Sequence, residues 1–434
     1  MMLPKLFCLT LLLAVAFSLE TFNEKNNITR KDPNFPFQGE MFTGFIVVDN
    51  KTQANLYYHL FAVKETVLTN DAPVIIWLQG GPGCASAFGN YNELGPVKIL
   101  NTSGNTGFSY EKNEWTWNKL AHLVFIDQPA GSGFSRANGL NVSSTYQASQ
   151  NFQVFLARFY QLYPELSGNQ LFLFGESYAG KYVPMFASEL LKNQTFTRQI
   201  TIGGIGIGDG WSDPLRQVPT YGSFGYVSGM IDGHTRDKLR LQELEAITLI
   251  RNQEYWKATK IANKILDNLA EAAGGVSEYD YREYDDGSNF PFSVWLNTSK
   301  TQDFLDIPYT TYEDCNPDVS DDFDDDNTRS VADLYPELIA KIPVLLYNGQ
   351  DDDNVDYEGT LNYINAMNWA DVKNFRKSER KVWKLSDGSK AGLVKGYGNF
   401  TFLLLFKAGH MVPIYVPQAS YEMVNKFINK IPLH

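Results

Sequence analysis

The chain contains the stretch Leu171-Phe-Leu-Phe-Gly-Glu-Ser-Tyr-Ala-Gly-Lys-Tyr-Val-Pro184, which decides how the rest is interpreted. Its four leading apolar residues favour a buried strand, Gly175 permits a tight turn, and the following residues can open a helix. Ser177 would then lie on a sharp strand-to-helix turn, with its hydroxyl projecting from the backbone at a helix N-terminus. This is a nucleophile's position. An ordinary serine in a glycine-rich turn remains the alternative, because the second glycine stands one place later than in the common Gly-x-Ser-x-Gly pattern.

Apolar runs elsewhere predict an α/β fold with a mostly parallel sheet. Continuous runs suit strands buried on both faces, and the helical stretch 144–163 falls between two of them. Residues 41–63 suit a hairpin. The expected strands lie at 74–78, 123–126, 171–174, 200–207, 344–347, 381–384 and 400–406. The glycines at 203–210 lack the spacing of a dinucleotide-binding loop, so no NAD or FAD is expected.

The middle of the chain predicts an inserted helical cap. Strand-like runs disappear between 213 and 335, and Leu, Ile and Ala recur at helical spacing over 239–273. The core of the fold would therefore be built from two parts, 19–212 and 336–434, with 213–335 between them.

The tail of this insertion is strongly acidic, at 278–288 and 316–326. Its alternate carboxylates, Asp322, Asp324 and Asp326, superficially resemble a calcium loop, but Asn327 stands where that loop needs glycine. We therefore expect a solvated, mobile acidic loop and no metal site.

The N-terminus is typical of a secretory signal peptide over residues 1–18. Lys5 precedes an apolar run, and Ala16-Phe17-Ser18 has the small-x-small form of a cleavage site. The alternative, a membrane anchor, is disfavoured because a bilayer needs about 20 apolar residues. The formal net charge of -12 argues against nucleic-acid or anionic-membrane partners. We expect no membrane association after cleavage.

Sequons and cysteines also indicate the secretory pathway, with an extracellular or a lysosomal or vacuolar destination. Cys8 lies in the signal peptide, which leaves Cys84 and Cys315 as an even pair in an oxidising route, although the sequence alone does not show that they bond. Glycosylation sequons occur at Asn27, Asn50, Asn101, Asn141, Asn193, Asn297 and Asn399.

A nucleophilic serine needs a base, and the base needs an orienting carboxylate. His410, in Ala408-Gly-His-Met-Val-Pro413, follows an expected strand and is the best-placed histidine, although a surface residue is the alternative. The acid should lie between serine and histidine in the chain, also after a strand. Residues 347–354 meet this condition, but their three consecutive aspartates, at 351–353, leave the choice open.

Several stretches resemble the serine carboxypeptidase family, a branch of the α/β-hydrolases. The match includes the strings around Ser177 and His410 and extends from about 35 to 430, thinning between about 240 and 335. The resemblance implies an α/β-hydrolase fold and a triad of Ser177, Asp352 and His410, with Asp351 as second choice for the acid. Further matching strings are Trp115-Thr-Trp-Asn118, Asp127-Gln-Pro-Ala-Gly-Ser-Gly-Phe-Ser135, Gly208-Asp-Gly-Trp-Ser-Asp-Pro214 and Gly229-Met-Ile-Asp232.

The same resemblance assigns groups around the triad. It places an oxyanion hole at the backbone N–H groups of Gly81 and Tyr178, and it implies a disulfide between Cys84 and Cys315. Four residues are assigned to the substrate's terminal carboxylate: Gln79, Glu93 and Glu176, with Trp77 beside them. The family commonly has Asn at the position of Gln79, so the fit of this amide is open.

The sequence thus predicts a serine carboxypeptidase that releases single C-terminal residues from peptides or proteins through an acyl-enzyme at Ser177. Two carboxyl groups held close together cannot both ionise easily, so activity should favour acidic pH. No cofactor and no metal are expected. The alternatives are an acyltransferase or an esterase that uses the same triad, and a non-catalytic protective or binding protein. A homodimer and the side-chain specificity remain undecided.

Overall fold

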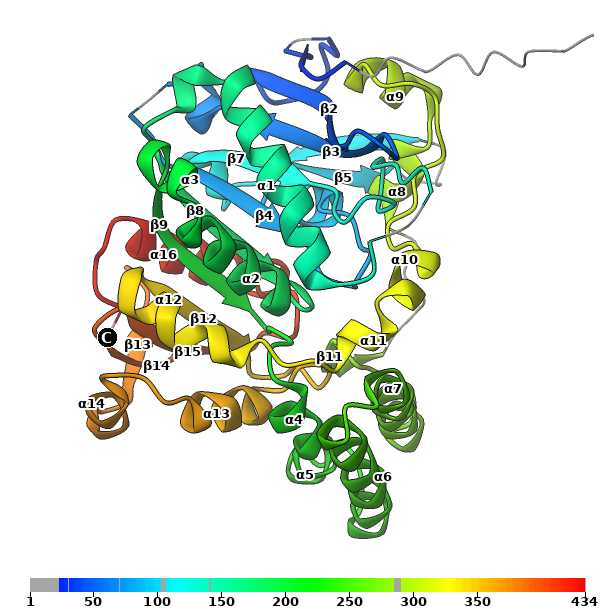
Figure 1. The fold of residues 1–434 in the computed structure, drawn as a ribbon, viewed down its shortest axis with the longest axis vertical. Helices are drawn as coiled ribbons and strands as arrows, with labels where there is room; N and C mark the ends of the chain where they lie inside the picture. The colour runs from blue at the N-terminus through cyan, green and yellow to red at the C-terminus, as the bar shows by residue number, and fades with distance from the viewer. Residues whose placement is uncertain are drawn as a thin grey trace, which may run out of the picture.

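The apolar runs form one eleven-stranded sheet that crosses the molecule in the order β1-β2-β3-β7-β4-β8-β9-β12-β15-β14-β13 (Figure 1). The structure is a computed structural model that describes residues 23–29, 31–69, 71–102, 107–139, 142–284 and 290–433. The predicted signal peptide and the sequon at Asn141 lie outside the described residues.

The sheet is mixed, with a parallel centre and antiparallel edges, so the expectation of a mostly parallel sheet holds for its centre. The central parallel strands are β7 (His122–Ile126), β4 (Val74–Leu78), β8 (Gln170–Glu176), β9 (Thr201–Gly208), β12 (Val344–Gly349) and β15 (Phe400–Leu405). The edge strands are β1 (Asn26–Asn27), β2 (Met41–Asp49) and β3 (Ala54–Phe61) on one side, and β14 (Lys390–Tyr397) and β13 (Lys381–Lys384) on the other. The sequence predicted β9, β12, β13 and β15 but not β14. Lysines and glycines interrupt the apolar alternation of β14.

Helices cover both faces of the sheet, and β8 shows why. Leu171 and Leu173 pack into one apolar cluster, whereas Phe172 and Phe174 pack into the other, as alternation along a strand requires. The first cluster includes helices α1 (Thr145–Leu162) and α2 (Ala179–Lys192), which lie in front of the sheet in Figure 1. The second includes α16 (Pro417–Ile428), on the opposite face. A strand buried on both faces therefore carries the nucleophile turn.

The helices of the predicted insertion, residues 213–335, include two groups that lie at different ends of the molecule (Figure 1). The first projects beyond the sheet and contains α4 (Pro214–Gln217), α5 (Tyr221–Val227), α6 (Gly233–Arg251) and α7 (Tyr255–Ala272). The helical region expected over 239–273 is thus two helices, which separate where Gln253 has φ 62°. The second part, α8 (Pro291–Leu296) and α9 (Ser299–Leu305), packs near β5 (Val97–Asn101), which pairs with β6 (Phe108–Lys112). There Phe35 stacks against Trp295, so this part belongs to the core.

The acidic tail is ordered, and the expectation of a solvated, mobile loop over 316–326 is wrong. Its residues form α10 (Pro317–Asp322) and α11 (Asp324–Asn327), and Asp324 and Asp326 are buried. Their cationic partners, Lys260 and Lys181, come from α7 and α2. These lysines are distant from the acidic segment in the sequence and approach it only in the folded chain, so the sequence around Asp324 and Asp326 does not indicate them. The other acidic stretch begins with a hairpin of β10 (Val276–Ser277) and β11 (Asp280–Tyr284).

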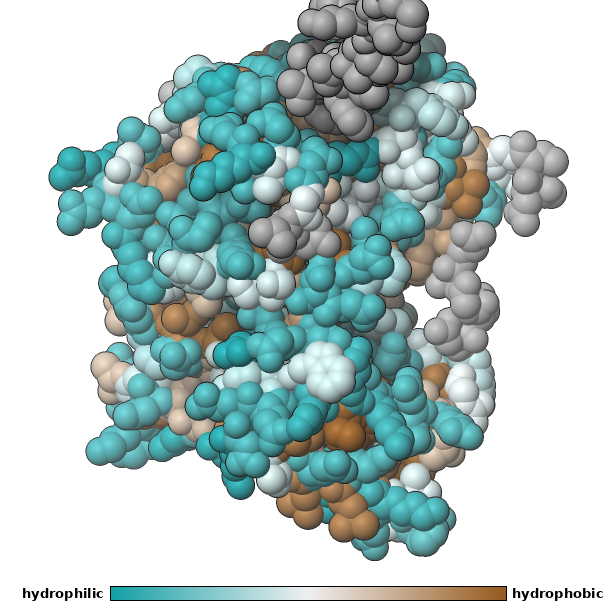
Figure 2. Space-filling view, turned by 45° about the vertical axis from the view of Figure 1, so that its right-hand side comes forward, coloured by the Kyte–Doolittle hydropathy of each residue, from teal (hydrophilic) through white to brown (hydrophobic). Residues whose placement is uncertain are grey.

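The molecular surface is mainly hydrophilic in the view of Figure 2, and hydrophobic side chains gather at the end formed by α5 to α7. Exposed apolar residues there include Val227 and Leu241. Among the described residues, no helix combines the length and the apolar character that a membrane crossing needs.

The sequons within the described residues lie at the surface. The asparagines at five of them are exposed, and Asn193 is partly exposed. Asn297 and Asn399 use their side-chain amides to donate to the backbone oxygens of Tyr312 and Ile339. The exposed asparagines are Asn27, Asn50, Asn101, Asn297 and Asn399.

A disulfide joins Cys84 to Cys315, as the family resemblance implied. It ties the glycine-rich loop after β4 to the start of α10 and closes a loop across a sequence separation of 231 residues. A crosslink over so many residues removes much of the freedom of the unfolded chain.

Replacing both cysteines with serine is expected to lower the free energy of unfolding by up to about 5 kcal/mol, because the unfolded chain regains that freedom. Denaturant unfolding followed by tryptophan fluorescence measures the change. Reductant should lower the midpoint of the wild type towards that of the double variant and leave the variant unaffected. Equal midpoints for wild type and variant under oxidising conditions would contradict the expectation.

Candidate active site

Ser177 lies on the predicted turn between β8 and α2, in a left-handed backbone conformation with φ 62°. Three backbone hydrogen bonds hold it there. Its N–H donates to the Gly208 oxygen at 3.0 Å, and its own oxygen accepts from Gly180 at 2.8 Å and Trp211 at 2.9 Å. Positive φ is costly for serine, so the surrounding bonds must impose it. The result is a partly buried serine held on a turn at the wall of a cavity.

Gly80 allows the glycine-rich loop to pack directly against this turn. A Cβ atom at position 80 would lie 2.6 Å from Ser177 Cβ and 2.6 Å from the Tyr178 nitrogen. Such distances are impossible without moving the turn, so the close approach requires glycine. The loop and the turn therefore fix one another.

His410 and Asp352 form the base and acid of a triad geometry. His410 Nδ1 lies 2.8 Å from Asp352 Oδ2, and both residues are buried. The other Asp352 oxygen accepts from the backbone N–H groups of Asn354 at 3.0 Å and Val355 at 3.3 Å. His410 Nε2 bonds to no described residue, and His410 lines the same cavity as Ser177. The structure thus brings the three predicted residues to one place.

The neighbouring aspartates have different surroundings. Asp351 accepts from the Tyr281 hydroxyl at 3.0 Å and pairs with Arg282 at 3.1 Å. Asp353 is buried, and burial raises its pKa to about 9. Of the three consecutive aspartates, Asp352 is the one that bonds to His410, and it is therefore the candidate acid.

Asp209 is a buried acid beside the triad to which the sequence assigned no role. Its Oδ1 accepts from the Gly349 N–H at 2.8 Å and from the Asn348 side chain at 3.2 Å. Burial, and then the charge of Asp352, raise its pKa well above the ordinary value, which favours its protonated form beside Asp352. Ligand atoms of Asp209, Asp352 and His410 lie within 4.8 Å of one another, as a metal site would require. Because Asp352 and His410 already bond to each other, we interpret these three side chains as part of the candidate triad and not as a metal site.

Two backbone N–H groups are placed to form an oxyanion hole. Gly81, with φ 104°, and Tyr178 both lie beside Ser177 at the wall of a cavity. Neither N–H donates to a backbone oxygen of any described residue. Free donors beside a nucleophile can stabilise a negatively charged oxygen.

Two cavities meet at Ser177 and Gly81. The larger cavity, of about 530 Å³, is lined by Gln79, Glu176 and His410. The smaller cavity, of about 390 Å³, lies on the other side, towards α7. The nucleophile is therefore accessible from two directions with different chemistry.

Gln79 links two of the residues assigned to carboxylate recognition. Its Oε1 accepts from Trp77 Nε1 at 2.8 Å, and its Nε2 donates to Glu176 Oε1 at 3.0 Å. Trp77 and Glu93 are buried and do not line the larger cavity, whereas Gln79 and Glu176 do. Trp77 thus lies behind the site and orients the Gln79 amide.

Glu93 and Glu176 form a buried acid pair. Burial raises the pKa of Glu93 to about 7. Burial, and then the charge of Glu93, raise the pKa of Glu176 well above its ordinary value. Glu176 Oε2 accepts no hydrogen bond from a described residue. The pair therefore keeps a proton at acidic and neutral pH and can donate it in a hydrogen bond.

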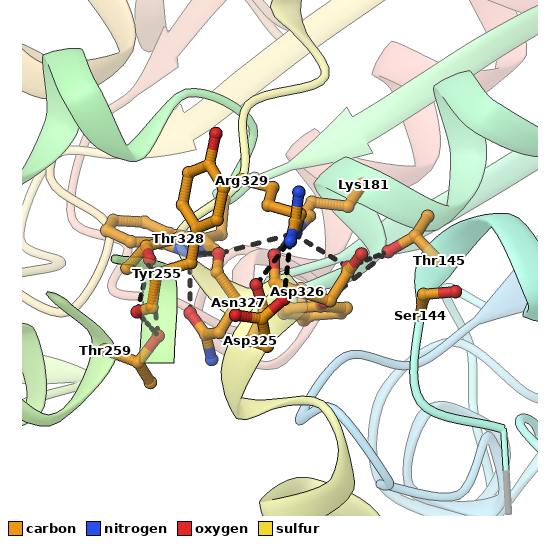
Figure 3. Close-up of polar contacts among 12 residues, drawn as sticks. Ser144, Thr145, Lys181, Tyr255, Thr259, Asp325, Asp326, Asn327, Thr328 and Arg329 are labelled. Carbon is orange, nitrogen blue, oxygen red and sulfur yellow. Dashed lines mark hydrogen bonds and ion pairs between the residues drawn. The ribbon is translucent and has the colours of Figure 1, made fainter. Parts of the chain in front are cut away.

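The Tyr178 side chain belongs to a second buried network, which the sequence did not reveal. Figure 3 shows Asp326 of this network between Lys181 and Thr145. Asp326 Oδ2 accepts from the hydroxyls of Tyr178 and Thr145, each at 2.6 Å, and lies 2.9 Å from Lys181 Nζ. Lys181 is fully buried and also donates to backbone oxygens of Asp326 and Asn327. The acidic segment of the insertion is thus bound to the helix that begins behind the nucleophile.

The charges of this network persist at acidic pH. Burial alone would raise the pKa of Asp326, but Lys181 and the Thr145 and Tyr178 hydroxyls hold it below its ordinary value. Burial lowers the pKa of Lys181 to about 8. Below that pH the lysine is charged and its partner remains ionised, so the ion pair is retained.

Comparisons with known proteins show which family the chain resembles over nearly its whole length. The sequence profile described as serine carboxypeptidase matches residues 32–430. A protein named "Probable serine carboxypeptidase CPVL" from Dictyostelium discoideum is 32% identical over 403 residues, which cover 90% of this chain and 79% of that protein. "Carboxypeptidase Y homolog A" from Arthroderma otae is 33% identical over 414 residues, covering 90% of this chain and 74% of that protein.

A solved structure shows the same similarity. The prohormone-processing carboxypeptidase Kex1 from Saccharomyces cerevisiae superposes with a TM-score of 0.78 and 26% identity, covering 92% of each chain. The similarity therefore includes the core strands and most of the insertion.

The Asp326→Ala substitution is expected to lower the free energy of unfolding by about 3–5 kcal/mol, because it leaves the Lys181 charge buried without a partner. Asp325→Ala is the matched control. The Asp325 carboxylate pairs with Arg329 in an exposed ion pair, so its loss should lower the free energy of unfolding by less than about 1 kcal/mol. Urea unfolding measures both values. A similar loss for the two variants would contradict a special role for Asp326, and adding Lys181→Met to Asp326→Ala should restore part of the loss.

Proposed function

The chain belongs to the serine carboxypeptidase family, and we propose that it releases single residues from peptide C-termini through an acyl-enzyme formed on Ser177. It is a serine-type carboxypeptidase that acts on peptide substrates. The observation that carries the proposal is the buried acid Glu176, which Gln79 bonds at the wall of the cavity shared by Ser177 and His410, and whose pKa is raised by burial and by Glu93. A buried acid beside the nucleophile suits a substrate that presents a carboxylate at the scissile bond.

Acylation follows from the positions of the triad. His410 Nε2 removes the proton from the Ser177 hydroxyl, whose oxygen attacks the carbonyl carbon of the last peptide bond. Asp352 accepts the His410 Nδ1 proton in a hydrogen bond and stabilises the imidazolium. The N–H groups of Gly81 and Tyr178 stabilise the carbonyl oxygen as it becomes negative. His410 then donates its proton to the leaving nitrogen, and the free amino acid departs.

Deacylation uses the same groups in reverse. A water molecule enters the place of the released amino acid, His410 Nε2 takes one of its protons, and the resulting hydroxide attacks the ester carbonyl carbon. The tetrahedral intermediate is again stabilised by the two N–H groups. His410 returns the proton to the Ser177 oxygen, and the shortened peptide leaves with a new carboxylate.

The terminal carboxylate is held by neutral donors. The protonated pair offers an O–H through Glu176, and Gln79 offers its amide. An O–H donor bonds the carboxylate without burying a second full charge, which would be costly. Glu93 acts from behind by keeping the Glu176 proton in place. This arrangement favours a free C-terminal acid over a neutral amide.

We place the protein in the secretory pathway, either outside the cell or in a lysosomal or vacuolar lumen. The signal peptide expected at 1–18, the surface sequons and the Cys84–Cys315 disulfide support this location. An acidic lumen would also keep the Glu93–Glu176 pair protonated.

Hydrolysis of an N-blocked dipeptide and of its C-terminal amide at about pH 5 tests the proposal. The free acid should be cleaved about 10- to 100-fold more efficiently, because charge-assisted hydrogen bonds recognise the carboxylate. Ser177→Ala should lower kcat by at least about ten-thousandfold. Ser167→Ala, an exposed serine remote from the triad, is the control and should have no effect.

Two results would contradict the proposal. Equal cleavage of the free acid and the amide would show that no site recognises the terminal carboxylate. Transfer of the acyl group to an added alcohol in preference to water would indicate an acyltransferase.

The preference for the free acid should decrease as the pH rises through about 7, the value to which burial raises the pKa of Glu93. Above it Glu93 is ionised while Glu176 keeps its proton, and the new negative charge behind Glu176 repels the substrate carboxylate, so the acid-to-amide ratio of kcat/KM should fall by up to about tenfold per pH unit. In the Glu93→Gln/Glu176→Gln variant the ratio should be lower but independent of pH, because amides do not titrate. A fall of the same size in this variant would show that another group is responsible.

A further inference from the structure

The two cavities at Ser177 must receive different parts of the substrate. His410 donates its proton to the leaving nitrogen, and His410 lines only the larger cavity. Gln79 and Glu176, which bind the terminal carboxylate in the proposed function, line that cavity as well. The released residue therefore occupies the larger cavity. The residue that remains attached to Ser177 as the acyl group lies on the opposite side and directs its side chain to the smaller cavity.

The smaller cavity carries two carboxyl groups from the insertion. Asp267 and Asn263 come from one face of α7, and Glu278 lies between β10 and β11. None of the described residues that line it is Lys, Arg or His. Any charge on its wall is therefore negative.

These carboxylates are not neutralised by neighbouring cations. Lys260 lies 2.6 Å from Asp324, Lys181 lies 2.9 Å from Asp326, and Arg329 pairs with Asp325. Asp267 and Glu278 form no ion pair with any residue that the structure describes. These three cations are thus paired with the acidic segment. Burial raises the pKa of Glu278, so the exposed Asp267 is the principal source of negative charge at the cavity wall.

The remaining walls suit a long side chain with an apolar stem. Trp211 and Tyr221 provide aromatic surface, and Leu266 adds an aliphatic contact from α7. Trp211 is held by two hydrogen bonds from its Nε1 to Asn327, at 2.9 Å to the backbone oxygen and 3.0 Å to the side chain. Lys and Arg bury their methylene stems against such walls while the charged group reaches a polar rim. Aromatic faces also attract cations.

We propose that Asp267 and Glu278 make the smaller cavity a subsite for a basic side chain, so that the enzyme prefers peptides with Lys or Arg next to the C-terminal residue. This inference rests on the proposed function, which fixes the direction in which the substrate lies. The walls of this subsite come largely from the insertion, whereas the reacting groups come from the core.

The test uses N-blocked dipeptides that share a C-terminal Phe and differ in the preceding residue, which is Arg or citrulline. Citrulline has nearly the shape of Arg but no charge, so the ratio of the two kcat/KM values reports recognition of the cation. We expect Arg to be preferred by about five- to tenfold, from one exposed ion pair and a cation–aromatic contact. Within each variant the ratio does not depend on the fraction of enzyme that is folded.

Asp267→Asn should lower the Arg-to-citrulline ratio by about fivefold. Asp267→Lys should bring it below one and should raise the ratio for Glu over Gln at the same substrate position. Glu271→Gln is the matched control, because it makes the same charge change on the same helix but does not line the cavity. It should leave the ratio unchanged.

The outcomes separate this inference from the proposed function. If the peptides are cleaved but the wild-type Arg-to-citrulline ratio is near one, the basic subsite is overturned. It is also overturned if Asp267→Asn and Glu271→Gln both keep the wild-type ratio. Failure to release Phe from either peptide would instead overturn the proposed function. A ratio that falls only in the Asp267 variants supports the subsite.

Discussion

The left-handed backbone conformation of Ser177 is the constraint on which the site depends. Glu176 lines the larger cavity, Ser177 lines both cavities, and Tyr178 lines the smaller one, so that its N–H lies where the proposed function needs an oxyanion donor. A relaxed conformation would not present all three groups at once. The bonds from Gly208 and Trp211, together with the close contact of Gly80, supply the energy that keeps the turn strained.

Burial then gives the same types of residue different roles. The Glu93–Glu176 pair forms no ion pair with any residue that the structure describes, and the charges of His410 and Lys98 offset the effect of burial on Glu93 only in part, so the raised pKa values favour protonated acids that can act as donors. Asp326, by contrast, is buried against Lys181 and stays ionised. The first pair therefore contributes recognition, whereas the second ties the insertion to the helix behind the nucleophile. What distinguishes them is the presence of a cation and not the extent of burial.

The features that the sequence predicted are those determined locally. The central strands appear as continuous apolar runs because both faces are covered, and the turn around Ser177 follows from glycines and an apolar run in one short stretch. What could not be predicted depends on contacts between distant residues. The order of the acidic tail requires Lys181 and Lys260, and the part played by Asp209 requires its approach to Asp352. The choice among three aspartates needed either a family resemblance or the observed His410 contact.

The division of the insertion explains how chemistry and specificity can vary separately. Its second part packs into the core through Trp295, so changes there affect stability. Its first part contributes α7 to the wall of the smaller cavity but provides none of the triad or oxyanion groups. A substitution on the cavity face of α7 therefore changes what the enzyme recognises without moving the strained turn. The Lys181–Asp326 pair connects the α7 wall of the smaller cavity to the nucleophile turn. Its segment α11 contacts α7 on one side and, through Lys181, the helix α2 that follows Ser177 on the other.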